Sequence, residues 1–210
     1  MTTAVPLRKK PAVPPAPRRI GREDSAAREA ILDATEAVLR DEGDAALSSR
    51  RVAEVAGLKQ QLVYYYFRTM DELLLAVFRR FAERFLDRQA QALASPRPLT
   101  ALWELYTDAS VAVIVVEFLA LANHRAAVRD EIAGATERFR VGQIDELGKA
   151  MQRVGLDTEA YPPSAIVMLM LTISTTMKME SGLGVEHGYA ELMDLVRRHI
   201  DKVEGSVAPA

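Results

Sequence analysis

Apolar residues recur at steps of three and four along most of this sequence, from Ser25 to Val203. Residues spaced in this way share one face of an α-helix, and no segment of convincing length alternates as a strand does. Glycine and proline divide the pattern into segments. The expected helices cover residues 25–43, 48–57, 60–66, 69–93, 99–107, 111–123, 125–154, 163–181 and 189–203. The sequence therefore predicts an all-α protein of about nine helices, without internal repeats.

The composition excludes several kinds of chemistry. The 210 residues include no Cys, so disulfides, Cys nucleophiles and Cys-ligated metal sites cannot form. There is no Gly-rich phosphate loop, no HExxH and no Gly-x-Ser-x-Gly, and the three His are scattered singly. We therefore expect no enzyme, no cofactor and no metal. An all-α enzyme or carrier of small molecules stays as the weaker alternative.

The length of the chain limits the number of domains, and the length of its apolar runs indicates whether it could span a membrane. A length of 210 residues fits one domain or two small ones. The longest apolar run, residues 111–122, is interrupted by Glu117 and is shorter than the roughly 18–20 residues of a membrane span. We expect a cytoplasmic protein that does not bind a membrane.

Charge is distributed unevenly along the chain. Residues 1–22 contain six basic residues, no acidic residue and five of the ten prolines, which predicts a disordered basic arm. Residues 1–88 carry 16 basic and 13 acidic side chains, whereas residues 89–210 carry 11 and 16. A polyanionic partner is therefore expected at the N-terminal end. The arm could instead serve only solubility, and residues 206–210 are expected to be a disordered tail.

Two of the expected helices are short and lie close together in the sequence. The segments 48–57 and 60–66 are separated by a turn at Gly57, an arrangement typical of a helix-turn-helix. Lys59, Gln60 and Gln61 begin the second segment, where a recognition helix presents donors to base edges. Tyrosines 64–66 cover most of one turn and cannot all face a core, although one could be buried and the others simply exposed. The next helix is expected to begin with a capping box, Thr69 to Glu72.

The stretch from residue 28 to residue 73 resembles the N-terminal DNA-binding region of the TetR/AcrR family. The resemblance is carried by Ile31-Leu32, Gly43, Ser48, Val52-Ala53, Ala56-Gly57-Leu58, Val63-Tyr64-Tyr65-Tyr66-Phe67 and Asp71-Glu72-Leu73. It implies a homodimeric, ligand-responsive transcriptional regulator, usually a repressor, that binds a near-palindromic operator. It also implies a helix-turn-helix DNA-binding domain over 23–69 and a helical effector-binding and dimerisation domain over 70–205. A DNA-binding protein without a small-molecule effector is the main alternative.

The resemblance assigns candidate DNA contacts. Ser48 falls where the family caps the second helix and touches phosphate, and Arg50 falls where some members read a guanine. Lys59, Gln61 and Met70 depart from the family, which commonly has Ser, Gly and Lys there. A Lys cannot cap a helix N-terminus, so we hypothesise that a phosphate or base acceptor offsets Lys59. The expected DNA-binding residues are Ser48, Ser49, Arg50, Lys59, Gln60, Gln61, Tyr64, Tyr65, Tyr66, Arg68 and Thr69.

The C-terminal half is expected to hold an effector and a second copy of the chain. Its flexible methionines favour an apolar effector. The candidate effector-binding residues are Trp103, Tyr106, Glu117, Phe118, Leu121, Phe139, Met168 and Thr172. Two interpretations of Glu117 stay open: it could bind the effector, or it could form an ion pair with Arg125 or Arg129. The candidate dimer contacts are Met177, Tyr189, Leu192, Met193, Val196 and Ile200.

Overall fold

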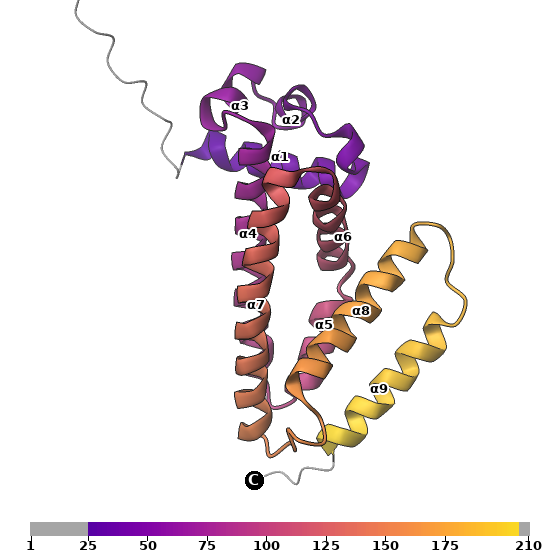
Figure 1. The fold of residues 1–210 in the computed structure, drawn as a ribbon. Helices are drawn as coiled ribbons and strands as arrows, with labels where there is room; N and C mark the ends of the chain where they lie inside the picture. Colours follow the sequence, from indigo (N-terminus) through magenta and orange to yellow (C-terminus); the bar gives the residue numbers. More distant parts are fainter. Residues whose placement is uncertain (1–24, 206–210) are drawn as a thin grey trace, which may run out of the picture.

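The structure is a computed structural model that describes residues 25–205, apart from the side chain at position 127. The predicted arm at 1–22 and the predicted tail at 206–210 lie outside these residues. Within residues 25–205 the chain forms nine α-helices and one 3-10 turn, and no strand, which confirms the all-α fold (Figure 1). The helices are α1 (Ala26–Glu42), α2 (Ser49–Val55), α3 (Gln60–Tyr66), α4 (Met70–Leu93), α5 (Pro98–Thr107), α6 (Ala109–His124), α7 (Ala126–Arg153), α8 (Pro163–Ser181) and α9 (Tyr189–Gly205), and the 3-10 turn η1 is Asp44–Ala46.

Local sequence explains where several helices begin and end. Gly57 has φ 65°, the left-handed backbone that glycine adopts without steric cost at the corner between α2 and α3. Thr69 caps α4 by accepting from the amide of Glu72 at 3.0 Å. The expected capping box is only half formed, because the Glu72 carboxylate reaches one residue further back and accepts from the Arg68 amide at 2.9 Å.

The arrangement in space places the short helices at one end of a long column. In Figure 1, α1, α2 and α3 form this end, α4 and α7 run side by side away from it, and α8 and α9 diverge from the column. The core is divided into two apolar clusters. One joins α1–α4 to Ile114 and Phe118 of α6 and to Val128 of α7, and the other surrounds Trp103 and Met151 where α5, α7, α8 and α9 meet. The first cluster contains side chains from both sides of residue 70, so the short helices share a core with α6 and α7.

The lengths and compositions of the helices differ from those of a membrane span. Within the described residues, no single helix is both long and apolar enough to cross a bilayer. Only α5 and α6 taken together meet those requirements, and the two are bent by 60° relative to each other.

Asp108 stabilises the bend between α5 and α6. Its Oδ1 accepts from the Ser110 amide at 2.9 Å and caps α6, while its Oδ2 accepts from Arg88. The bonds from Ser110 and from Arg88 hold the pKa of the Asp108 carboxyl at about 2, below its ordinary value of 3.8. This carboxylate is therefore more favourable in the folded state than in the unfolded state.

We expect Asp108→Ala to lower the free energy of unfolding by about 1 kcal/mol, because the first turn of α6 loses its cap. Urea denaturation at neutral pH measures this change. Asp108→Asn is the matched control, since Asn also caps helices and should retain most of that stability.

The same carboxylate makes stability depend on pH. Its contribution is fully present above pH 3.8 and is lost as the pH falls toward about 2, because the pKa is lowered in the folded state. Unfolding measured across this interval should therefore show a shallower pH dependence in Asp108→Asn than in the unaltered chain. Identical pH profiles would contradict the role assigned to Asp108.

Candidate nucleic-acid interface and ligand cavity

An internal hydrogen-bond chain joins the two short helices. Gln60 donates from Nε2 to Ser49 Oγ at 2.9 Å, and Ser49 Oγ donates to the Tyr64 hydroxyl at 2.8 Å. Ser49 is only 6% exposed, so its hydroxyl acts within the motif and not at its surface. These bonds hold α2 and α3 in one relative orientation, and they engage one donor of Gln60, a residue expected at the DNA.

The outer surface of α2 and α3 presents donors that have no partner elsewhere in residues 25–205. The side chains of Arg50, Lys59, Gln61 and Arg68 are exposed and form no hydrogen bond or ion pair with other described residues. The adjacent Arg51 differs, because it forms three hydrogen bonds of 2.8–3.0 Å with Glu42 and an ion pair with Glu54 at 3.2 Å. Of two neighbouring guanidinium groups, one is therefore available to a partner and the other is held by carboxylates.

The aromatic residues of α3 divide between surface and interior. Tyr64 and Tyr65 are 53% and 46% exposed, while Tyr66 is half-buried with its ring 5.1 Å from that of Tyr65. Phe67, which follows α3, is buried beneath the guanidinium of Arg28. Two tyrosine side chains are thus exposed on the same helix as the unpaired donor Gln61.

The N-terminal caps of α2, α3 and α4 differ. Ser48 caps α2 by accepting from the Arg51 amide at 3.2 Å, and Thr69 caps α4, but Lys59 provides no side-chain cap for α3. Both Ser48 and Thr69 are exposed beside the helix-turn-helix, as a contact with DNA requires. Compensation of Lys59 by DNA stays a prediction.

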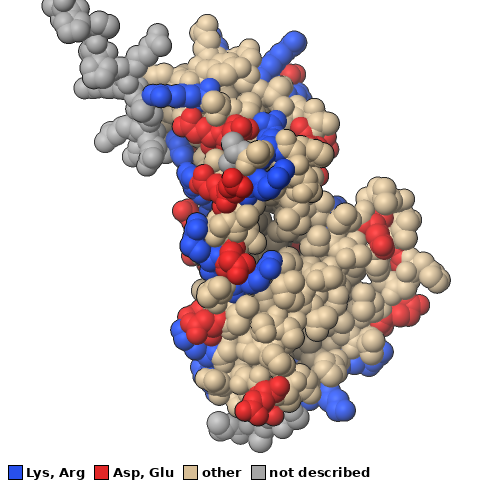
Figure 2. Space-filling model, viewed as in Figure 1, with Lys and Arg blue, Asp and Glu red and all other residues tan. Residues whose placement is uncertain are grey.

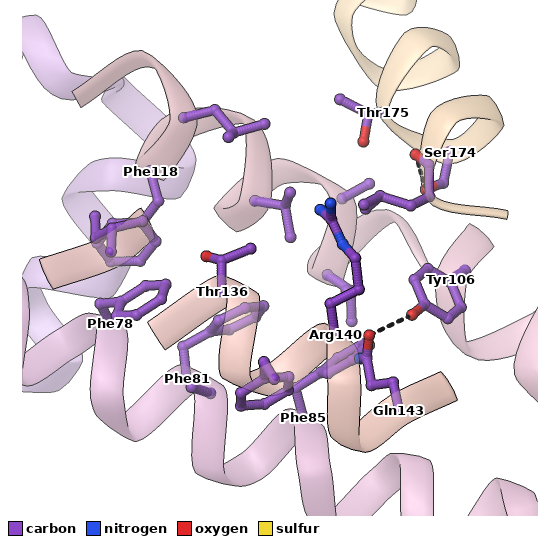
Figure 3. Close-up of a pocket in the computed structure, with 18 of the residues that line it drawn as sticks. Phe78, Phe81, Phe85, Tyr106, Phe118, Thr136, Arg140, Gln143, Ser174 and Thr175 are labelled. Atoms are coloured by element: carbon purple, nitrogen blue, oxygen red, sulfur yellow. Dashed lines mark hydrogen bonds between the residues drawn. The ribbon is translucent and has the colours of Figure 1, made fainter. Parts of the chain in front are cut away.

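A cavity of about 390 Å³ lies between α4, α6, α7 and α8, with one wall from α5. Its lining is predominantly apolar and includes six aromatic residues. Some of these rings contact one another: the ring centres of Phe78 and Phe118 are 5.2 Å apart, and those of Phe85 and Tyr106 are 5.6 Å apart. Figure 3 shows that Phe78, Phe81 and Phe85 line it from α4 and Thr136, Arg140 and Gln143 from α7. This volume lies within the range of about 300–1,000 Å³ that is typical of small-molecule sites.

Buried polar groups form one wall of the cavity. The Tyr106 hydroxyl donates to Gln143 Oε1 at 3.3 Å (Figure 3). Gln143 Nε2 in turn donates to Gln89 Oε1, behind the lining, at 2.8 Å. Burial raises the pKa of Tyr106 to about 12, so this hydroxyl keeps its proton at neutral pH. Gln89 is 3% exposed and Gln143 is 7% exposed, so the bond between them is buried inside the protein.

The structure brings some of the expected effector residues together and separates others. Tyr106, Phe118, Phe139 and Thr172 line the cavity. Leu121 is buried in the first apolar cluster, and Met168 is 40% exposed outside the cavity. Trp103 lies in the second cluster, beside a separate apolar cavity of about 380 Å³ between α5, α8 and α9. The sequence did not predict several other lining residues, among them Phe78, Phe81, Phe85, Arg140, Gln143 and the threonines of α8 other than Thr172.

Glu117 makes neither of the contacts considered for it. Its Oε2 accepts from the backbone amide of Asp44 in η1 at 3.2 Å, and it does not line the cavity. Arg125 instead donates to Asp71 at 2.6 Å, and Arg129 donates to backbone carbonyls at the end of α6. Burial raises the pKa of Glu117, and the bond from the Asp44 amide acts in the opposite direction. Glu117 therefore ties α6 to the segment that leads into α2.

The predicted dimer residues fall mostly on the inner side of their helices. Ile200 is buried, and Met193 and Val196 pack against the second cluster. Tyr189 is half-buried with its hydroxyl bonded to Glu180, and Met177 and Leu192 are half-buried.

The exposed apolar residues of this region are Met168, Leu169, Met179, Leu183, Val185 and Leu195. Figure 2 shows that charged side chains gather over α1–α4 and along α4 and α7, whereas the face over α8 is largely uncharged.

Comparison with known proteins gives the same assignment for the N-terminal region. Residues 31–77 match the bacterial regulatory proteins of the tetR family. An uncharacterized HTH-type transcriptional regulator in the dhlA 5′ region of Xanthobacter autotrophicus is 36% identical over 81 residues, 39% of this chain and 38% of the relative. The HTH-type transcriptional regulator BetI of Rhizobium meliloti is 32% identical over 73 residues, 33% of this chain and 36% of that protein. The match thus spans less than two fifths of these curated relatives.

Solved structures share the fold of nearly the whole chain. A TetR transcription regulator from Haloarcula marismortui has a TM-score of 0.62 at 20% identity, covering 86% of this chain and 97% of that one. The fatty acid degradation regulator FadR of Bacillus halodurans has a TM-score of 0.65 at 17% identity, covering 90% and 100%. FadR of Bacillus subtilis in complex with stearoyl-CoA has a TM-score of 0.55 at 18% identity, covering 73% and 88%. The residues that match the tetR family, 31–77, contain α2, α3 and the turn between them.

Proposed function

We propose that this protein binds a near-palindromic operator as a homodimer, represses transcription there, and is released by a small, apolar effector. The observation that carries the DNA-binding part is the surface of α2 and α3, where Arg50, Lys59 and Gln61 are exposed without partners in the described chain. Recognition helices use such donors on base edges and phosphates. A protein that acts on chromosomal DNA works in the cytoplasm, where we place it.

The cavity supports regulation by a ligand. It is predominantly apolar and lies between helices of which α4 and α6 also contact α1, whereas a DNA-binding protein without an effector requires no such space. Phe118 lines the cavity, and its neighbour Glu117 holds the amide of Asp44. Filling the cavity would displace α6 and with it the segment that positions α2. The complex of Bacillus subtilis FadR with stearoyl-CoA is consistent with an apolar effector in this fold.

The uncharged face of α8 supports a homodimer. Leu169, Met179 and Leu195 are 61%, 58% and 58% exposed, and residues 160–177 contain no charged side chain. Exposed apolar side chains on a largely uncharged face are typical of an interface. A second copy packed there across a two-fold axis would place two recognition helices on successive half-sites.

The proposed function is tested by selecting bound duplexes from a random pool with the purified full-length protein, at near-physiological salt. Enrichment of one two-fold-symmetric site, by a protein whose mass in solution is that of a dimer, is the expected result. Salt-sensitive binding that enriches no site would contradict sequence-specific regulation and would favour an architectural role.

We expect Arg50→Ala to weaken operator binding by about 1–3 kcal/mol if this guanidinium contacts a base, and to relax preference at one base pair per half-site. Arg51→Ala removes the same charge from the adjacent position, but that arginine is already engaged by Glu42 and Glu54. Titration of both variants with selected and single-substituted duplexes distinguishes them. If both variants lose the same affinity for every duplex, Arg50 contributes only nonspecific electrostatic attraction and reads no base.

We expect Glu117→Ala to lower the free energy of unfolding by about 1–2 kcal/mol and to accelerate hydrogen exchange of the Asp44 amide, which would lose its acceptor. Native-state hydrogen exchange measures the second effect directly. Glu117→Gln keeps a side-chain oxygen and should preserve most of the protection. Unchanged exchange at Asp44 in the Ala variant would show that this bond does not hold η1.

We expect Leu169→Glu to convert the dimer to a monomer, because it places two charges in the proposed interface. Val141 on α7 is also 61% exposed but lies away from the uncharged face, so Val141→Glu is the matched control. Sedimentation velocity measures both masses. A dimeric Leu169→Glu variant would rule out this face as the interface.

A further inference from the structure

One charged side chain lines the aromatic cavity. Among the described residues around it, only Arg140 carries a charge, and none is acidic. Figure 3 shows Arg140 extending from α7 into the cavity toward α8, where Ser174 and Thr175 line the opposite side. Within residues 25–205 its guanidinium forms no hydrogen bond and no ion pair. The cavity therefore has a positive group and no negative group to balance it.

Other arginines that lie between helices of this protein are paired. Arg80 contacts Glu29, Asp33 and Glu36, Arg88 contacts Asp108, and Arg125 contacts Asp71. A guanidinium that is partly removed from water needs such a partner, because its desolvation is unfavourable until an anion or several acceptors replace the lost water. At Arg140 the described residues supply no such partner, although they do so at the other three arginines.

The neighbouring polar groups do not substitute for an anion. Gln143 lies one turn further along α7. Its amide oxygen accepts a hydrogen bond from Tyr106, and its amide nitrogen donates one to Gln89. Thr136 and Thr175 have no side-chain hydrogen bond to another described residue, so their hydroxyls are available as additional donors. The unpaired groups in the cavity are thus one guanidinium and nearby hydroxyls, surrounded by phenylalanine rings.

We propose that the cavity binds an apolar carboxylate. Its carboxylate pairs with the forked N–H groups of Arg140, which fit a carboxylate through two parallel hydrogen bonds. Its hydrocarbon body packs against Phe78, Phe81 and Phe85. This inference names the chemical class of the effector and rests on the proposed function for its regulatory meaning. A free carboxylate is specified, because an ester or an alcohol of the same body leaves Arg140 unpaired.

The test is calorimetric titration of the full-length protein with two carboxylates, decanoate and 3-phenylpropionate, and with 1-decanol as the uncharged counterpart of the first. We expect at least one carboxylate to bind, and decanol to bind more weakly than decanoate if the straight chain is the body that fits. Arg140→Gln should weaken carboxylate binding about 10- to 100-fold, the range for loss of a hydrogen-bonded charge pair. The same variant should bind decanol at least as well as the unaltered protein does.

Two further variants separate the role of Arg140 from general effects. Arg138→Gln removes an equal charge from an exposed position on the same helix that does not line the cavity, and it should leave affinity unchanged. Arg140→Lys keeps the charge without the fork and should bind with intermediate affinity. Circular dichroism and the thermal midpoint verify that each variant is folded.

The inference is overturned if neither carboxylate binds, or if Arg140→Gln binds them as tightly as the unaltered protein. Either result leaves the proposed function intact when the duplex selection still enriches a symmetric site. Conversely, the protein could bind carboxylates through Arg140 while the duplex selection enriches no site. This result would support the carboxylate site and contradict sequence-specific regulation. The two failures are therefore distinguishable.

Discussion

The apolar cluster shared by α1–α4, α6 and α7 is the contact on which the rest of the molecule depends. Helices α2 and α3 have seven residues each. Helices of this length are too short to be stable without tertiary packing. They are held because Val52 and Val63 pack in the same cluster as Phe118 and Val128. A change in the packing of α6 or α7 therefore reaches the helix-turn-helix without passing through a flexible linker.

This continuity gives the cavity a physical route to the DNA-binding surface. Phe78 and Phe118 contact each other in the cavity wall and in the shared cluster, and Glu117 adds a polar contact to η1. A ligand can shift the equilibrium between two conformations only by as much as its affinity for them differs. A tenfold change in operator affinity needs about 1.4 kcal/mol of such coupling, which is of the order of a single one of these contacts.

Local rules predicted the secondary structure well and the site less well. Every helix expected from periodicity is present, with ends that differ by a few residues, and Gly57 turns the chain as expected. The short turn η1 was missed because three residues leave no periodic signal. Arg140 was missed because it lies on a long helix rich in charged residues, where nothing in the neighbouring sequence distinguishes an arginine that faces a cavity from one that faces water.

The sequence by itself determined the helices, several of their caps and the resemblance of residues 31–77 to the tetR family, because these depend on residues a few positions apart. Tertiary structure alone decided which groups meet: Glu117 lies 73 residues from Asp44, and Gln143 lies 54 from Gln89. It also decided that α9 turns Met193, Val196 and Ile200 inward and leaves Leu195 exposed. Such choices follow from how whole helices pack against one another, and a helical repeat specifies an apolar face without specifying what covers it.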